Sequence, residues 1–288
     1  MEQRFVLGLE GRLAGRMFSV EGGVARSEVV PGGSGGFGLR EHPPTMDIEP
    51  LVCVIGTGMS RAFYDWIGNT VARTHQRKSG SVIQLDHRSK MVRRREFFDA
   101  LVTEVRFPDL DRFSTSEAVM KVVLHPERIR DTDERVKTLG VYAASLPKAW
   151  SVNHFRMQID GLPTDSAKIT KIKGLSLKQG IKQFYTGGDR FPTLEPTKVQ
   201  LRDITIELPL GYGKEFTKWF EESLDPRKTH AREKNGSIEF LAPGSRSAFF
   251  VVALKNIGIV TLAKTANAYR IQLAYQSLKM SAGGAAVK

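Results

Sequence analysis

The second half of the chain repeats sequence patterns of the first half. Residues 5–11 read FVLGLEG, and residues 155–161 read FRMQIDG. The pattern FYDW of residues 63–66 returns in residues 216–219 as FTKW, with Phe and Trp at the same spacing. A repeat of this length corresponds to a whole domain rather than to a short solenoid unit. We therefore expect two copies of one fold, an arrangement that suits a ring or a rod better than a single active site.

The length of the chain fits this division. With 288 residues, two domains of ordinary size are expected, and each is long enough to bury its own core. The repeats place the first domain at residues 1–134 and the second at residues 153–288. Residues 135–152 have no counterpart inside the second copy, so they are expected to be a linker.

Cysteine content and the apolar runs bear on the compartment. The single cysteine, Cys53, excludes an internal disulfide framework and predicts a reducing compartment. It lies in the apolar run LVCVI, which predicts a small buried hydrophobic residue. The start, MEQR, lacks the apolar part of a secretory signal, and no run of about 18 apolar residues exists. We expect cytoplasmic assembly and no membrane segment.

Alternation of apolar and polar residues dominates both halves. Strand-like alternation occurs in residues 5–9, 101–107, 155–159, 204–208 and 271–275. A period of two is typical of strands with one buried face. The predicted fold class is therefore mainly β, a sandwich or barrel with one flanking helix, duplicated in tandem.

Each half also contains one helical pattern. The first is expected over residues 61–71 with Ser60 as its N-cap, and the second over about residues 215–224. Apolar residues spaced i, i+3, i+4 form one face of each helix: Phe63, Trp66 and Ile67 in the first, Phe216, Trp219 and Phe220 in the second. Phe63, Trp66, Phe216 and Trp219 are accordingly predicted to be structural core residues.

Two glycine-containing loops are candidate contact sites. Residues 30–38 read VPGGSGGFG and include Gly32, Gly33, Gly35 and Gly36, and the second half carries Gly187 and Gly188 at the matching place. A phosphate-binding loop requires GxxxxGK[ST] leading into a helix, and here the Pro-rich segment EHPP follows instead. We interpret both as long loops that act as ring-contact loops between subunits.

Motifs for catalysis or metal binding were not found in the sequence. The six histidines show no HExxH spacing. His75 and His230 recur at matching positions, which is interpreted as a shared turn rather than a shared catalytic role. No catalytic residue, metal or cofactor is therefore expected.

The charge of the chain is unevenly distributed. The net charge is +12, of which the 22 basic and 19 acidic residues of positions 1–150 give +3 and the 21 basic and 12 acidic residues of positions 151–288 give +9. Basic surface can attract nucleic acid or an acidic partner, but a solvated or subunit-facing surface is the favoured interpretation. The basic run at residues 90–95, KMVRRR, is a candidate phosphate patch that is expected to form an exposed turn.

Each half resembles the tail tube protein of contractile phages and of related contractile injection systems. The shared pattern is a strand ending in Asp-Gly or Glu-Gly, a strand ending in Gly, an aromatic-Gly-Gly loop, a long strand, Gly-x-Gly, a Trp-bearing helix and closing strands. In the second half these segments are residues 155–161, 169–174, 184–188, 199–208, 211–213, 216–219, 238–240, 253–256 and 268–273. The first half keeps fewer of them, with Pro31 in place of the aromatic residue and Pro50 in the middle strand.

The resemblance implies a small β-sandwich or barrel with a flanking helix, six of which form a ring around a lumen. Ordinary tube proteins have one domain and form hexamers. Two domains in one chain resemble instead hub and adaptor proteins, in which three chains match a trimeric spike to a hexameric tube. We therefore expect a trimeric, pseudo-sixfold adaptor or initiator ring of a virion tail or injection-system particle. Its expected partners are further copies of itself, tail tube subunits, the baseplate hub or spike, and the sheath.

Three alternatives remain open at this point. The chain could be the main tail tube subunit of the same machine, a basic nucleic-acid-binding β-barrel protein, or an enzyme supported only by the matched histidines. Specific nucleic-acid binding is not expected, because interleaved surface aromatics are missing. The ring hypothesis relies on residues 101–107 and 271–275 being open sheet edges, since neither carries a Pro or Lys guard.

Overall fold

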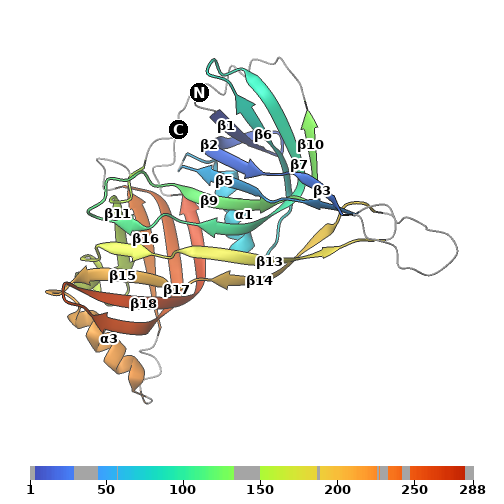
Figure 1. Cartoon of the computed structure of the whole chain (residues 1–288). Helices are drawn as coiled ribbons and strands as arrows, with labels where there is room; N and C mark the ends of the chain where they lie inside the picture. The colour runs from blue at the N-terminus through green and yellow to red at the C-terminus, as the bar shows by residue number, and fades with distance from the viewer. Residues whose placement is uncertain are drawn as a thin grey trace.

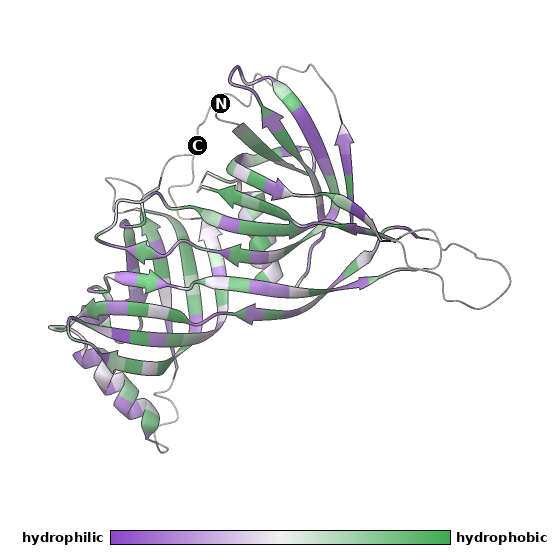
Figure 2. Ribbon diagram, in the orientation of Figure 1, coloured by the Kyte–Doolittle hydropathy of each residue, from purple (hydrophilic) through white to green (hydrophobic). Residues whose placement is uncertain are grey.

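The fold is mainly β, as the sequence predicted, and its strands form two large sheets (Figure 1). The computed structural model describes residues 4–28, 45–56, 58–132, 150–186, 189–225, 227, 233–241 and 247–282. Hydrophobic and hydrophilic residues share most strands (Figure 2), as expected for sheets with one buried face. Among the described helices, none is long and apolar enough to cross a membrane.

The first half of the chain forms a closed six-stranded barrel. Its strands are β1 (Arg4–Leu9), β2 (Arg12–Gly22), β5 (Leu51–Ile55), β6 (Lys78–Leu85), β7 (Met91–Arg106) and β9 (Met120–His125). They follow one another in the order β1, β6, β7, β9, β5, β2, and β2 closes the barrel on β1. Shorter strands accompany them: β3 (Ala25–Glu28), β4 (Thr45–Ile48), β8 (Leu110–Asp111) and β10 (Arg128–Thr132).

The second half forms an open half-barrel with the same strand order. The strands are β11 (Phe155–Ile159), β12 (Lys171–Lys173), β15 (Ile204–Pro209), β16 (Lys234–Leu241), β17 (Ala248–Lys264) and β18 (Ala268–Ala282). They run β11, β16, β17, β18, β15, β12, which matches the first half strand for strand. The barrel stays open because β12 pairs with β8 of the first half instead of with β11.

The two halves share a backbone irregularity at the same place. In the first half Asp99 has a φ of 53°, and in the second half Asn256 has a φ of 53°. The backbone N–H of Asp99 donates to Oγ of Ser79 at 3.1 Å, and that of Asn256 donates to Oδ1 of Asn235 at 3.3 Å. Asp and Asn tolerate the left-handed region better than most residues, which explains why they occupy this position.

A second shared irregularity lies further along the same strands. The pairing of β7 with β9 shifts register between Val102 and Glu104, and the pairing of β17 with β18 shifts between Ile259 and Thr261. The positions of the register shifts differ by 157 residues (259 − 102), and Asp99 and Asn256 differ by the same number (256 − 99). One offset of 157 therefore relates β7 to β17. Corresponding positions of β7 and β17 can therefore be assigned residue by residue.

The two predicted helices are present. Helix α1 spans Arg61–Val71, and the side chain of Ser60 accepts the N–H of Phe63 as its N-cap. Helix α3 spans Lys214–Leu224 and has no local side-chain cap. Instead Asp165 of α2 (Pro163–Ser166) accepts the N–H of Glu215 at 2.7 Å, so this cap comes from a distant segment. Trp66 and Phe63 of α1, and Trp219 and Phe216 of α3, are buried.

A long hairpin from the second half joins the two halves. It consists of β13 (Ser176–Phe184) and β14 (Thr193–Leu201), and we call these two strands the arm. Strand β13 pairs with β7 of the first half, and the arm extends away from the body of the molecule (Figure 1). One continuous core connects the halves, and it includes Trp150 and Val152 from the end of the predicted linker.

Two expectations about exposed segments were wrong. Residues 104–106 are not an open edge, because they lie between β9 and the arm, and residues 271–273 lie between β15 and β17. The arginines of the basic run do not form a turn, because Arg93–Arg95 belong to β7 and pair with β6 and β10. Both errors concern which distant strands become neighbours, which local alternation does not specify.

Candidate assembly interface

The contact between the arm and the first barrel is a short antiparallel strand pairing. Ser176 lies opposite Arg106, Leu177 opposite Val105, and Lys178 opposite Glu104. Leu177 and Val105 are buried, while the opposite charges of Lys178 and Glu104 face each other across the strands. The arm therefore covers the strand edge that β7 would otherwise expose.

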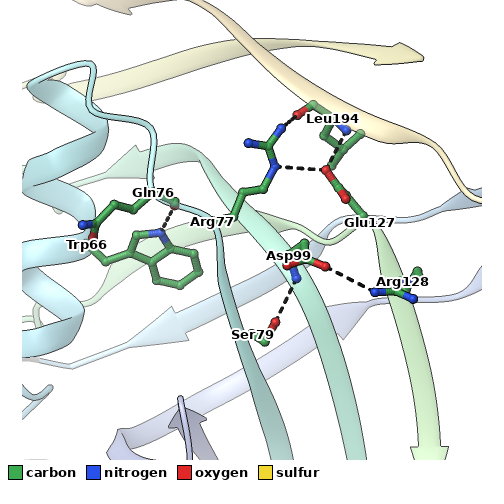
Figure 3. A network of polar contacts seen from close by, with 8 residues as sticks. All are labelled: Trp66, Gln76, Arg77, Ser79, Asp99, Glu127, Arg128 and Leu194. Carbon is green, nitrogen blue, oxygen red and sulfur yellow. Dashed lines mark hydrogen bonds and ion pairs between the residues drawn. The ribbon is translucent and has the colours of Figure 1, made fainter. Parts of the chain in front are cut away.

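A polar cluster fastens the second strand of the arm (Figure 3). Glu127 accepts the backbone N–H of Leu194 at 2.8 Å and the side-chain Nε of Arg77 at 3.1 Å. Arg77 also donates to the carbonyl of Leu194, so one residue of the arm is bound through both its backbone groups. Leu194 itself is fully buried. This arrangement fixes the position of the arm along the barrel as well as its distance from it.

His75, one of the two matched histidines, contacts the arm. It has a φ of 44° in the turn after α1, and its Nδ1 accepts a hydrogen bond of 2.7 Å from the amide Nε2 of Gln179. The next residue, Gln76, accepts the indole N–H of Trp66 at 2.7 Å (Figure 3). The turn thus connects helix, arm and barrel. His230 lies outside the described residues.

Aromatic side chains fill the space between the halves. Tyr64 of α1 lies 5.0 Å from the ring of Phe250, and Phe107 stacks on the ring of Phe240 at 6.2 Å. Trp150 meets Phe240 edge-on at 4.7 Å. All five are buried, and aromatic pairs at these distances contribute beyond their buried area. The interface between the halves is therefore a packed core rather than a wet surface.

The predicted contact loops lie outside the described residues, but the strands that flank them are described. Gly32, Gly33, Gly35, Gly36, Gly187 and Gly188 all fall in undescribed segments. Strand β4, after the first loop, lies beside the end of the arm: the N–H of Met46 donates to the carbonyl of Arg190 at 2.8 Å. Gln183 also donates to Asp47 at 3.0 Å. The structure thus brings the flanks of the two loops together, with Phe184 exposed at the end of β13.

The chemistry of the described residues is that of packing and strand pairing. No group of three or more His, Cys, Asp or Glu side chains among them could hold a metal ion. Burial raises the pKa of the Cys53 thiol to about 12, so this group remains protonated and unreactive at neutral pH. A surface hollow of about 440 Å³ beside β11 and α2 is lined by residues that include Arg156, Asp160 and Ser166. The side chain of Ser166 already donates to the carbonyl of Leu162.

Sequence comparison and structure comparison give different results. No family model matches the sequence, and no curated protein matches it. Among solved structures, a chain of the sheath–tube complex of the extracellular contractile injection system PVC is similar to this protein. The match covers 51% of this chain and 99% of that chain, with 16% identity and a TM-score of 0.39. The tube-terminating cap of the anti-feeding prophage matches over 51% and 99%, with 12% identity and a TM-score of 0.42.

Another similar structure is Hcp1 from Flavobacterium johnsoniae, which is matched over 98% of its length by 46% of this chain, with 14% identity and a TM-score of 0.32. Each of these structures is therefore matched almost whole by about half of this chain. The similar structures are components of contractile injection systems or Hcp proteins, in agreement with the resemblance noted from the sequence.

Proposed function

We propose that this chain is a structural component of a contractile phage tail or injection-system tube. Within that machine it forms a trimeric, pseudo-sixfold adaptor or initiator ring between the baseplate hub or spike and the tube. Its role is assembly, without catalysis or a cofactor. It assembles in the cytoplasm and is retained in the finished particle, where tail tube subunits, hub or spike and sheath are its partners.

The observation that carries this proposal is the repetition of one strand order in both halves. The order, the left-handed residues Asp99 and Asn256 and the register shifts agree between β7 and β17. Such agreement supports a tandem duplication with domains at residues 1–134 and 153–288, joined by residues 135–152. Two equivalent units in one chain supply six ring positions from three chains, because closed rings are the usual outcome of head-to-tail contacts.

The difference between the halves favours an adaptor over a uniform tube subunit. The first half closes its barrel by pairing β2 with β1, whereas the second half leaves its barrel open and pairs β12 with β8. A ring built from such chains alternates two kinds of surface around its axis. Such alternation suits a junction between a threefold and a sixfold structure, whereas a uniform repeating tube does not need it.

Cryo-electron microscopy of the assembled particle tests this function. The expected result is one ring of three chains around the tube axis, with closed and open barrels alternating. Six chains in each ring, stacked along the tube, would identify the main tube subunit instead. A position away from the tube axis would contradict both the adaptor and the tube subunit.

A further inference from the structure

The edge that the arm covers on β7 has a counterpart on β17. With the offset of 157, residues 104–106 of β7 correspond to residues 261–263 of β17. Within the described part of the chain, β17 beyond Ile257 pairs only with β18, and its other side has no strand. The same strand position is therefore covered in the first half and uncovered in the second.

Exposure of the side chains follows this difference. Thr103, beside the residues that the arm covers, is 8% exposed, and its counterpart Val260 is 46% exposed. Val105 is fully buried, whereas its counterpart Leu262 is only partly buried. The uncovered edge thus presents apolar side chains to solvent, although the corresponding positions of the first half lie inside the core. Uncovered apolar strand edges bind other strands unless something protects them.

The helices show the same contrast. Trp219 of α3 corresponds to Trp66 of α1, an offset of 153, so Leu224 corresponds to Val71. Val71 packs against the common core at the junction of the halves, where α1 faces β18. Leu224 is 66% exposed, because α3 lies at the outer end of the molecule (Figure 1). The second half therefore exposes, on strand and helix together, the surface that the first half uses to bind its neighbour.

The strand that fits this surface is present in the first half. Gly22 and Gly174, with φ of 83° and 85°, occupy the same place before β3 and β13, an offset of 152. The carbonyl of Val24 accepts the N–H of Glu49, as the carbonyl of Ser176 accepts the N–H of Arg202. Hairpin β3–β4 is thus the counterpart of the arm. Among the described strands β3 pairs only with β4, and Val24 is 50% exposed.

We propose that residues 24–26, where β3 begins, pair antiparallel with residues 261–263 of β17 in a second copy of this chain. Transferring the register of the arm places Val24 opposite Ala263, Ala25 opposite Leu262, and Arg26 opposite Thr261. The pairing of the arm with β7 inside one chain is the template for this contact. The strand that binds the uncovered edge of β17 therefore comes from the first half of another copy. This inference rests on the proposed function, for which it specifies the contact between chains.

The contact has the geometry needed to extend an assembly. It joins the first half of one chain to the second half of the next, so it is head-to-tail and repeats until a ring closes or a filament forms. Strand addition supplies main-chain hydrogen bonds, and the apolar side chains of Val24, Leu262 and Val260 lose their exposure. Leu224 on α3 faces the same neighbour.

Cysteine cross-linking tests the register. Val24→Cys and Ala263→Cys are made in separate chains, mixed, and treated with a short bifunctional thiol reagent. The expected product is a covalent dimer, because directly opposite residues of paired strands have Cβ atoms about 5 Å apart. The control pairs Val24→Cys with Lys255→Cys, an exposed residue of β17 that lies outside the uncovered edge. Cys53 stays in place, because it is buried.

A charge placed on the edge tests the same contact independently. Val260→Lys in the Ala263→Cys chain should lower the yield of the cross-link at least tenfold, since a lysine on an edge strand blocks strand addition. Val92→Lys in the same Ala263→Cys chain is the matched control, because Val92 of β7 is exposed to a similar degree, 49% against 46% for Val260. It should leave the yield unchanged. Equal losses for the two lysine variants would overturn the proposed edge.

The outcomes separate this inference from the proposed function. A specific cross-link together with closed trimeric rings supports both. A specific cross-link with open filaments supports the edge contact and contradicts the ring. Trimeric rings without the cross-link overturn the edge contact and leave the ring in place. Neither rings nor a cross-link in concentrated protein contradicts both.

Discussion

Gly80 and Gly236 occupy the same place in the two halves. At each glycine a strand passes close to the backbone of the first strand of its half, so an added Cβ would meet the carbonyl of Gly8 or of Gln158. We predict that Gly80→Ala and Gly236→Ala each lower the free energy of unfolding by about 1–3 kcal/mol, the usual cost of overpacking. Denaturant titration measures this. Gly211→Ala is the control, because nothing lies within 4 Å of its added Cβ.

Trp66 and Trp219 are the largest buried side chains of their helices. Replacing either by alanine should lower the free energy of unfolding by about 3–5 kcal/mol, because a large cavity forms in the core. Trp66→Phe separates packing from the hydrogen bond to the carbonyl of Gln76. Trp66→Phe should lower the free energy of unfolding less than Trp66→Ala does in the same titration. Wild-type thermal stability of either alanine variant would contradict a core role.

The Cys53 thiol links stability to alkaline pH. Burial raises its pKa from 9.0 to about 12, so the folded protein keeps the proton after the unfolded chain has lost it. The contribution of Cys53 is therefore fully present below pH 9.0 and is lost as the pH rises toward 12. We expect no reaction with a thiol reagent at pH 8 until denaturant is added. Absorbance of the released reagent measures this, and rapid labelling of native protein would contradict the burial.

At the scale of elements, the attachment of the arm can be tested at Glu127. Its carboxylate accepts hydrogen bonds from Arg77 and from the backbone N–H of Leu194. Glu127→Gln should therefore lower the free energy of unfolding by about 1–2 kcal/mol and speed amide exchange at Leu194. Hydrogen exchange measures the second effect directly. Glu10→Gln is the control, because the side chain of Glu10 is 58% exposed, against 14% for Glu127, so its pair with Lys78 contributes little. Equal exchange rates at Leu194 in both variants would contradict the role of Glu127.

Elements that depend on local signals were predictable from the sequence. Helix α1 begins after Ser60 as expected, because the cap and the apolar spacing lie within one segment. The strands around Phe155 and Ile204 follow from alternation in the same way. The neighbours of each strand were not predictable, because alternation does not specify which distant strand pairs with it. The cap of α3 by Asp165 is a similar long-range contact.

At the scale of the whole molecule, the repeat in the sequence predicted more than the motifs did. The paired patterns predicted two related halves, and the common strand order agrees with them. The candidate interface was only partly predictable. The sequence predicts contact sites at the glycine-rich loops but not at the uncovered edge of residues 258–264, because the exposure of Val260 depends on the strand register.

The net charge of +12 leads to the last prediction, which separates assembly from nucleic-acid recognition. Part of the basic run is already neutralised, because Asp131 binds Arg95 at 2.7 Å and Arg93 at 2.5 Å. These arginines lower the pKa of Asp131, so the pairs remain charged near neutral pH. We expect duplex DNA to bind only at low salt, with an affinity that falls steeply as salt rises and shows no sequence preference. Fluorescence anisotropy with two unrelated duplexes over a salt series measures this. Retention of one duplex over the other at physiological salt would favour the nucleic-acid-binding alternative, because charge alone cannot distinguish base sequences.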